Sequence, residues 1–233
     1  MKFKYLLQYS TLLFSFILSL IFTIVVKDNG FFYESVLQVS IPANYFFNLH
    51  PGFGLLPDSI ATGHPPFVGY YLALVWFLFG KSLLVSHIAF MPFIWGFIFY
   101  SIKLSQQLTD SYWLGLVGGL AMYIEPIILG QGSVLSFDII QALFIITSIY
   151  SFFNNQKAFL FLSLIFLSLI NMRSGLAAIG FACGFLIIWY LRNGKLSAKE
   201  LFITLAPLLI MLFYYFYHYI DKGWVIHNTV SNR

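Results

Sequence analysis

Several acidic and basic side chains stand at the ends of apolar segments. Asp28 and Glu34 stand six residues apart directly after a long apolar run, and Asp138 opens another such run. A carboxylate within reach of a hydroxyl or amine can act as a general base. A cation such as Arg173, which lies between two apolar segments, can stabilise negative charge. Ionisable groups at the ends of apolar helices usually face a partner or a polar cavity, so these residues together indicate a site where apolar segments end.

The sequence His64-Pro65-Pro66 directly precedes the apolar segment 67–80. Proline disfavours helix in the residue before it and suits a first helical turn, so an extended approach followed by a helix is expected. A helix over 67–80 would be about 21 Å long, against a hydrocarbon core of about 30 Å. We therefore expect an interfacial or re-entrant helix that does not cross the membrane.

The composition indicates an integral membrane protein. Hydrophobic residues make up 60% of the chain and charged residues only 9%, whereas about a quarter of the residues of soluble proteins are charged. No basic run resembles a nucleic-acid surface, and no His or Cys cluster has the spacing of metal ligands. Membrane lipids are therefore expected partners, while nucleic acid, metal and cofactor are not.

Apolar segments predict an all-α, polytopic transmembrane helix bundle that forms a single domain over residues 1–233. About seven segments are candidates for spans, each needing about 20 residues to cross. A long connection, 27–66, is expected as a loop on the outer face. The expected spans are 5–26, 82–103, 112–130, 133–153, 158–170, 174–191 and 201–219.

The distribution of Lys and Arg gives an orientation. If 67–80 does not cross, seven of these residues fall on the N-terminal side and five on the other. If it does cross, the split becomes six to six. Because cytoplasmic loops carry the excess of Lys and Arg, we expect a multi-pass cell-membrane protein with a cytoplasmic N-terminus and a non-crossing segment 67–80.

Each candidate side chain also has a structural interpretation. Asp28 beside Lys27 could anchor a helix end at the interface, and His64 could be an ordinary loop residue. Asp138 could compensate charge at a helix N-terminus. Glu125, which lies within an apolar stretch before a proline, is a further site candidate that could equally make a structural hydrogen bond to a neighbouring helix.

Three stretches resemble a known superfamily. They are "DNGFFYE" (28–34), "GHPPFVGYYLALVWFLFG" (63–80) and "MYIEPIILGQGSVLSFDIIQALFIITSIY" (122–150). In type and order they are similar to the membrane half of the GT-C glycosyltransferases that use polyprenyl-phosphate-linked sugars. Bacterial protein-mannosyltransferase-like proteins and lipid A aminoarabinose transferases are the nearest groups, and the resemblance covers about residues 5–192.

The resemblance implies an enzyme that transfers a sugar from a polyprenyl-phosphate donor to a glycan, lipid or protein acceptor on the outer face of the membrane. It implies that Asp28 is the catalytic base, and that Glu34 and Asp138 are further catalytic carboxylates. It places His64, where lysine is common, with Pro65 and Pro66 in the donor-binding motif, and assigns Arg173 to the donor phosphate.

Two other expectations stay open. The chain matches only the N-terminal half of such enzymes, so a truncated GT-C module, with a second subunit supplying the missing half, is expected. A non-catalytic membrane subunit, a transporter of lipid-linked saccharides or an inactive truncated relative are the alternatives. A transporter would show internal repeats or interrupted helices in matching halves, and the sequence shows no repeat.

Overall fold

The computed structural model describes residues 2–49 and 54–225, and in these ranges every regular element is a helix. One π-helical segment, η1, precedes the second helix. The elements are α1 (Lys2–Val26), η1 (Val36–Ser40), α2 (Ile41–Asn48), α3 (Phe67–Phe79), α4 (Leu83–Thr109), α5 (Tyr112–Tyr123), α6 (Pro126–Ser133), α7 (Phe137–Phe153), α8 (Lys157–Ile170), α9 (Met172–Asn193) and α10 (Ala198–Lys222).

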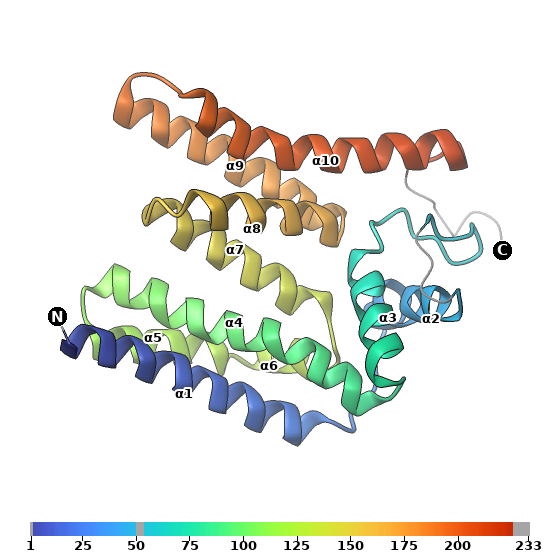
Figure 1. Cartoon of the computed structure of the whole chain (residues 1–233), viewed down its shortest axis with the longest axis horizontal. Helices are drawn as coiled ribbons and strands as arrows, with labels where there is room; N and C mark the ends of the chain where they lie inside the picture. The colour runs from blue at the N-terminus through green and yellow to red at the C-terminus, as the bar shows by residue number, and fades with distance from the viewer. Residues whose placement is uncertain (1, 50–53, 226–233) are drawn as a thin grey trace.

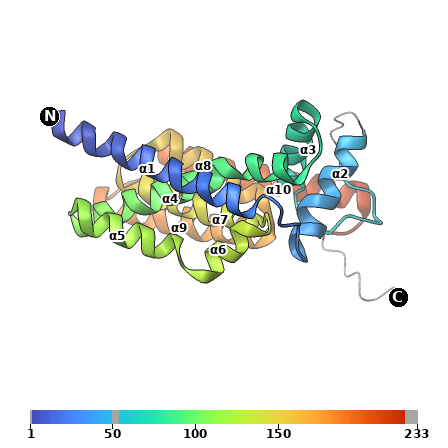
Figure 2. The same ribbon diagram turned by 90° about the horizontal axis from the view of Figure 1, so that it is seen from below.

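The longer helices run side by side along the longest axis of the molecule, and α2 and α3 gather at one end of them (Figure 1). Figure 2 shows the same arrangement after a quarter turn, with α3 directed across the bundle. The helix α1 packs on α4, which also packs on α5 and α7, and α8 joins α7 to α9 and α10. One end of the bundle therefore carries the N-terminus, and the opposite end carries α2 and α3.

Several helices are long and apolar enough to cross a membrane, which indicates a membrane protein. Four qualify singly, namely α1 from Tyr9 onward, α4, α9 and α10, and the bent pair α5 and α6 gives up to five. The expected number was about seven. The helices α3, α7 and α8 are apolar but shorter.

The segment 112–130, expected as one span, is interrupted, because the chain breaks between α5 and α6. The two helices meet at an angle of 58°. Pro126 begins α6, and a proline at this position offers no N–H to continue the preceding helix. The connection 27–66 is also not a simple loop, since it contains η1 and α2.

Local caps account for most helix starts. Ser82 and Ser111 accept the backbone N–H groups of Val85 and Leu114, and so satisfy N–H groups that a helix leaves unpaired. At α10, Ser197 and Glu200 form a reciprocal capping box. Such caps fix where each helix emerges from the apolar region.

Glycines bring α5 against α4. A Cβ added at Gly119 would lie 2.4 Å from the Cα of Ile102, and one at Gly115 would lie 2.4 Å from the Cα of Gln106. Small residues at this spacing allow two backbones to approach closely in a membrane. The break after α5 is therefore anchored to a tightly packed helix pair.

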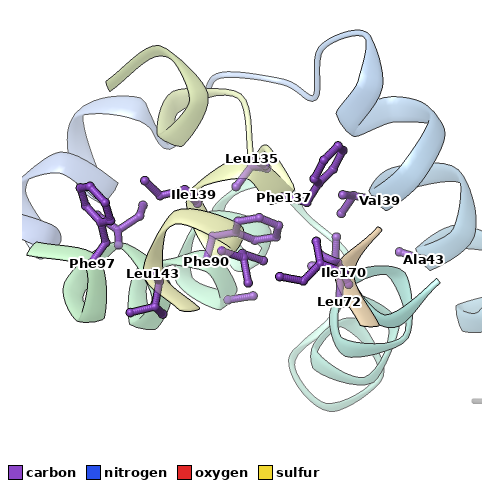
Figure 3. Close-up of a cluster of buried hydrophobic side chains, with 14 of the residues drawn as sticks. Val39, Ala43, Leu72, Phe90, Phe97, Leu135, Phe137, Ile139, Leu143 and Ile170 are labelled. Atoms are coloured by element: carbon purple, nitrogen blue, oxygen red, sulfur yellow. The ribbon is translucent and has the colours of Figure 1, made fainter. Parts of the chain in front are cut away.

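The largest core cluster lies where α2, α3, α4 and α7 meet (Figure 3). Val39 and Ala43 approach it from η1 and α2, and Leu72 approaches from α3. Each of these three side chains is buried, and Phe90 of α4 belongs to the same cluster. This cluster holds the short elements at their end of the bundle, and so supports the loops described next.

Candidate functional site

Polar segments gather at the end of the bundle that carries α2 and α3 (Figure 1). The C-terminus of α1, the start of α3, the first turns of α7 and α9 and the end of α10 all lie there. The sequence predicts one shared polar face for these segments, and the structure places them at one end. The candidates located there are Asp28, Glu34, His64, Asp138 and Arg173.

A cavity of about 410 Å³ opens at this end, between the loop after α1 and the connection from α6 to α7. One wall is formed by residues 32–35 and the other by residues of α6 together with the first turn of α7. Glu34 and Asp138 both line it, from opposite walls. Two of the three carboxylates predicted to be catalytic therefore face the same space.

A buried serine joins the two walls. The Ser35 side chain is 2% exposed, and its hydroxyl accepts the backbone N–H of Phe32 at 2.8 Å. The same hydroxyl lies 2.9 Å from the carbonyl oxygen of Val134 in the α6–α7 connection. This contact fixes the loop that carries Glu34 against the wall that carries Asp138.

Two residues near the cavity have a strained backbone conformation. Tyr33, which lines it, has φ 43°, and Leu135, which lies between the lining residues Val134 and Ser136, has φ 56°. Large non-glycine residues rarely adopt a positive φ, and such strain costs about 1–3 kcal/mol.

Arg173 does not line the cavity but pairs with Glu34, which does. Its Nη2 lies 3.6 Å from Oε1 of Glu34, and the two side chains are 76% and 35% exposed. An ion pair this exposed contributes only about 0–1 kcal/mol. A ligand anion could therefore replace Glu34 as the partner of the guanidinium at little cost.

His64 bridges three elements through its backbone and ring. Its Nδ1 accepts the backbone N–H of Met172 at 3.3 Å, and its carbonyl oxygen accepts the hydroxyl of Tyr214 at 3.1 Å. Burial lowers the pKa of the His64 imidazole, and the nearby Arg173 charge lowers it further, while Glu34 acts in the opposite direction. The ring is consequently neutral near pH 7.

The His64-Pro65-Pro66 segment leads directly into α3, which begins at Phe67 as the prolines predict. Pro65 and Pro66 are buried, so they fix the approach to α3. A neutral histidine in this place offers one ring N–H at Nε2, because Nδ1 is occupied as an acceptor. It supplies a hydrogen-bond donor in place of a permanent charge.

The position of Asp138 is compatible with both interpretations drawn from the sequence. Ser136 caps α7 by accepting the N–H of Asp138 at 3.1 Å, and the Ser136 hydroxyl lies 3.2 Å from Asp138 Oδ2. The carboxylate is thus held in the first turn of α7, where a negative charge suits the helix dipole. It also lines the cavity, so the structural and functional interpretations do not compete.

Of the predicted site residues only Glu34 and Asp138 line the cavity, and Asp28 and Glu125 have other neighbours. Asp28 is exposed in the turn after α1, and its charge acts on His87 of α4. Glu125 caps α6, because its carboxylate accepts the N–H of Ile128 at 3.0 Å. The structural interpretation therefore accounts for Glu125, and Asp28 has a different neighbour from Glu34.

The sequence interpretation overlooked some side chains at this end. His87 is 1% exposed, and its Nε2 lies 2.9 Å from the carbonyl oxygen of Asn29. A histidine inside the apolar run 82–103 was the available signal. Ser35 and Gln131 carry no such signal, because only the fold brings them to the cavity. Within the described ranges, no three His, Cys, Asp or Glu residues are grouped closely enough to hold a metal ion.

Comparisons with protein-family models, with curated proteins and with solved structures found no match to this chain.

Proposed function

We propose that this protein is a membrane glycosyltransferase that takes a sugar from a polyprenyl-phosphate donor at the α2–α3 end of its bundle. One observation carries the proposal. Two carboxylates from separate elements, Glu34 and Asp138, line one cavity, and an exposed arginine pairs with Glu34. The donor has an isoprenoid tail, so a cavity at the end of a membrane bundle gives the head group access while the tail stays in lipid.

The ion pair between Arg173 and Glu34 would couple donor binding to the release of Glu34. The donor phosphate is a diester with one negative charge, and its two non-bridging oxygens accept bidentate hydrogen bonds from a guanidinium. When the phosphate takes Arg173, Glu34 loses its partner and faces the cavity as a free carboxylate. Binding of the donor would thereby release the base that the reaction needs.

In the proposed reaction, Glu34 removes the proton from the acceptor hydroxyl or amine. The acceptor atom forms a bond to the anomeric carbon of the sugar, and the bond from that carbon to the phosphate oxygen breaks. The polyprenyl phosphate leaves with the electron pair, and Arg173 stabilises its charge. Asp138 orients the acceptor, and Asp28, which the resemblance favours as the base, is the alternative for proton removal.

We also propose that the bundle crosses the membrane seven times. In addition to the candidate spans, α7 and α8 run along the same direction (Figure 1). Their 17 and 14 residues correspond to about 25 and 21 Å, so flanking residues must complete each crossing. The helix α3, directed across the bundle, stays at the interface. The positive-inside rule then assigns the N-terminus to the cytoplasm and the cavity to the outer face.

Sugar transfer in proteoliposomes tests this function. Polyprenyl-phosphate-linked mannose and aminoarabinose serve as donors, with membrane extract as the acceptor source, and the measured quantity is polyprenyl phosphate released. Loss of a general base typically costs about 10²–10⁴ in rate, so Glu34→Gln should fall to near background and Asp138→Asn should be strongly impaired.

Asp58→Asn is the matched control, because Asp58 pairs with Lys222 at the end of α10 and does not line the cavity. It should retain nearly full activity. If Asp28→Asn abolished transfer while Glu34→Gln did not, Asp28 would be the base. If no donor were consumed by the wild-type protein in the presence of acceptor, the enzyme proposal would be wrong.

A further inference from the structure

A second cavity, of about 420 Å³, lies at the opposite end of the bundle. The helices α1, α4 and α7 and the start of α8 contribute to it. We call it the N-terminal-side groove, because it lies at the end where α1 begins (Figure 1). The residues used below are Tyr9, Phe99, Lys103, Tyr150, Gln156 and Phe159.

The groove opens toward the side of the bundle that faces lipid. Tyr9 of α1 is 68% exposed and Phe159 of α8 is 53% exposed, and both line it. In a bilayer such side chains contact acyl chains, since no water is present at that depth. The apolar rim therefore suits a hydrocarbon chain lying between α1 and α8.

One basic residue lines the groove among mainly apolar ones. Lys103 contributes an ammonium group, which lies 5.9 Å from the ring centroid of Phe99. Tyr150 and Gln156 add groups that can donate hydrogen bonds. None of the lining residues within the described ranges is acidic. The Glu200 carboxylate at this end pairs with Lys157 at 3.7 Å.

The depth of Lys103 corresponds to a lipid head group. It lies six residues before the end of α4, or about 9 Å along the helix, so its long side chain can reach the interface while its stem stays in the apolar region. Basic pockets between membrane helices bind the head groups of anionic lipids. Aromatic residues such as Tyr150 are typical of the same level.

We propose that the N-terminal-side groove binds one anionic phospholipid of the adjacent leaflet, with the phosphate at Lys103 and an acyl chain between α1 and α8. This site is independent of the proposed sugar transfer, because it lies at the other end of the bundle and shares no residue with the first cavity. Anionic lipid would thereby hold α1 against α8, two helices that are not neighbours in the chain.

Native mass spectrometry of the purified protein tests this site. The probes are phosphatidylglycerol and phosphatidylcholine of matched chain length, added to detergent solution. One basic residue at a membrane surface corresponds to about a fivefold preference for anionic lipid. We expect the first phosphatidylglycerol to bind about fivefold tighter than phosphatidylcholine, and Lys103→Gln to remove that difference.

Lys103→Arg should keep the preference, which separates loss of charge from loss of fold. Lys195→Gln is the matched control, because Lys195 is an exposed basic residue at the same end and does not line the groove. Equal binding of the two lipids, or an unchanged preference in Lys103→Gln, would overturn the proposal. So would preferential displacement of phosphatidylglycerol by polyprenyl phosphate, since the groove would then be a donor site.

Discussion

His64 connects the segment before α3 to the start of α9 and to the ion pair of Arg173 and Glu34. Its ring accepts an N–H from Met172 at the start of α9, and it shares its electrostatic surroundings with Arg173 and Glu34. Protonation would break the bond to Met172 and place a second positive charge beside Arg173. A neutral ring is therefore part of how the proposed site is held.

We predict that His64 titrates below its ordinary value of 6.5. Because the pKa is lowered in the folded state, its contribution to stability is present above that value and is lost as the pH falls through the folded pKa. Arg173→Gln should raise the pKa, and Glu34→Gln should lower it. NMR of ring-labelled histidine measures the pKa of His64, and the signal that disappears in His64→Gln identifies this residue. A pKa above 6.5 in the wild type, or one that does not respond to Arg173→Gln, would contradict this account.

The sequence predicts where helices start better than where they are interrupted. Proline chemistry correctly places the start of α3 at Phe67. The break between α5 and α6 is less visible, because residues 112–130 carry only one charge and read as continuously apolar. The helix α2 was missed because its buried residues Ala43 and Phe46 acquire a partner only when α3 packs on them.

The cavity itself could not be predicted from the sequence. Glu34 and Asp138 could be chosen as acids that follow or open apolar runs, but their common cavity depends on Ser35 contacting the α6–α7 connection. That contact joins residues 99 positions apart in the chain. Asp28 and Glu34 share a loop and were predicted to act together, yet the turn after α1 directs them to different neighbours.

Close packing of α5 on α4 supports this arrangement and can be tested at Gly119. An alanine Cβ there would lie 2.4 Å from the Cα of Ile102, so the helices must separate, and overpacking typically costs about 1–3 kcal/mol. Gly119→Ala should lower the apparent Tm in detergent. Gly180→Ala on α9, where no atom lies within 4 Å of the added Cβ, should leave it unchanged or higher. A Gly119→Ala protein as stable as the wild type would exclude this packing.

The whole molecule has two chemically different ends. At one, two carboxylates line a cavity and an arginine pairs with one of them, while the other has a groove with a lysine and no described acid among its lining residues. We propose that the two ends bind different lipids, with a phosphate-linked sugar donor at the α2–α3 end and a structural phospholipid at the other.

The central claim is that the phosphate of a polyprenyl lipid binds at Arg173 beside Glu34 and Asp138. The most direct measurement is photocrosslinking of a polyprenyl phosphate that carries a diazirine next to its phosphate, with labelled peptides identified by mass spectrometry. We predict labelling within residues 32–35 and 131–138, reduced at least about tenfold in Arg173→Gln, since a hydrogen-bonded charge pair contributes about 1.5–3 kcal/mol, and unchanged in Arg192→Gln at the opposite end. Labelling that avoids these segments, or that is the same in Arg173→Gln, would contradict the claim.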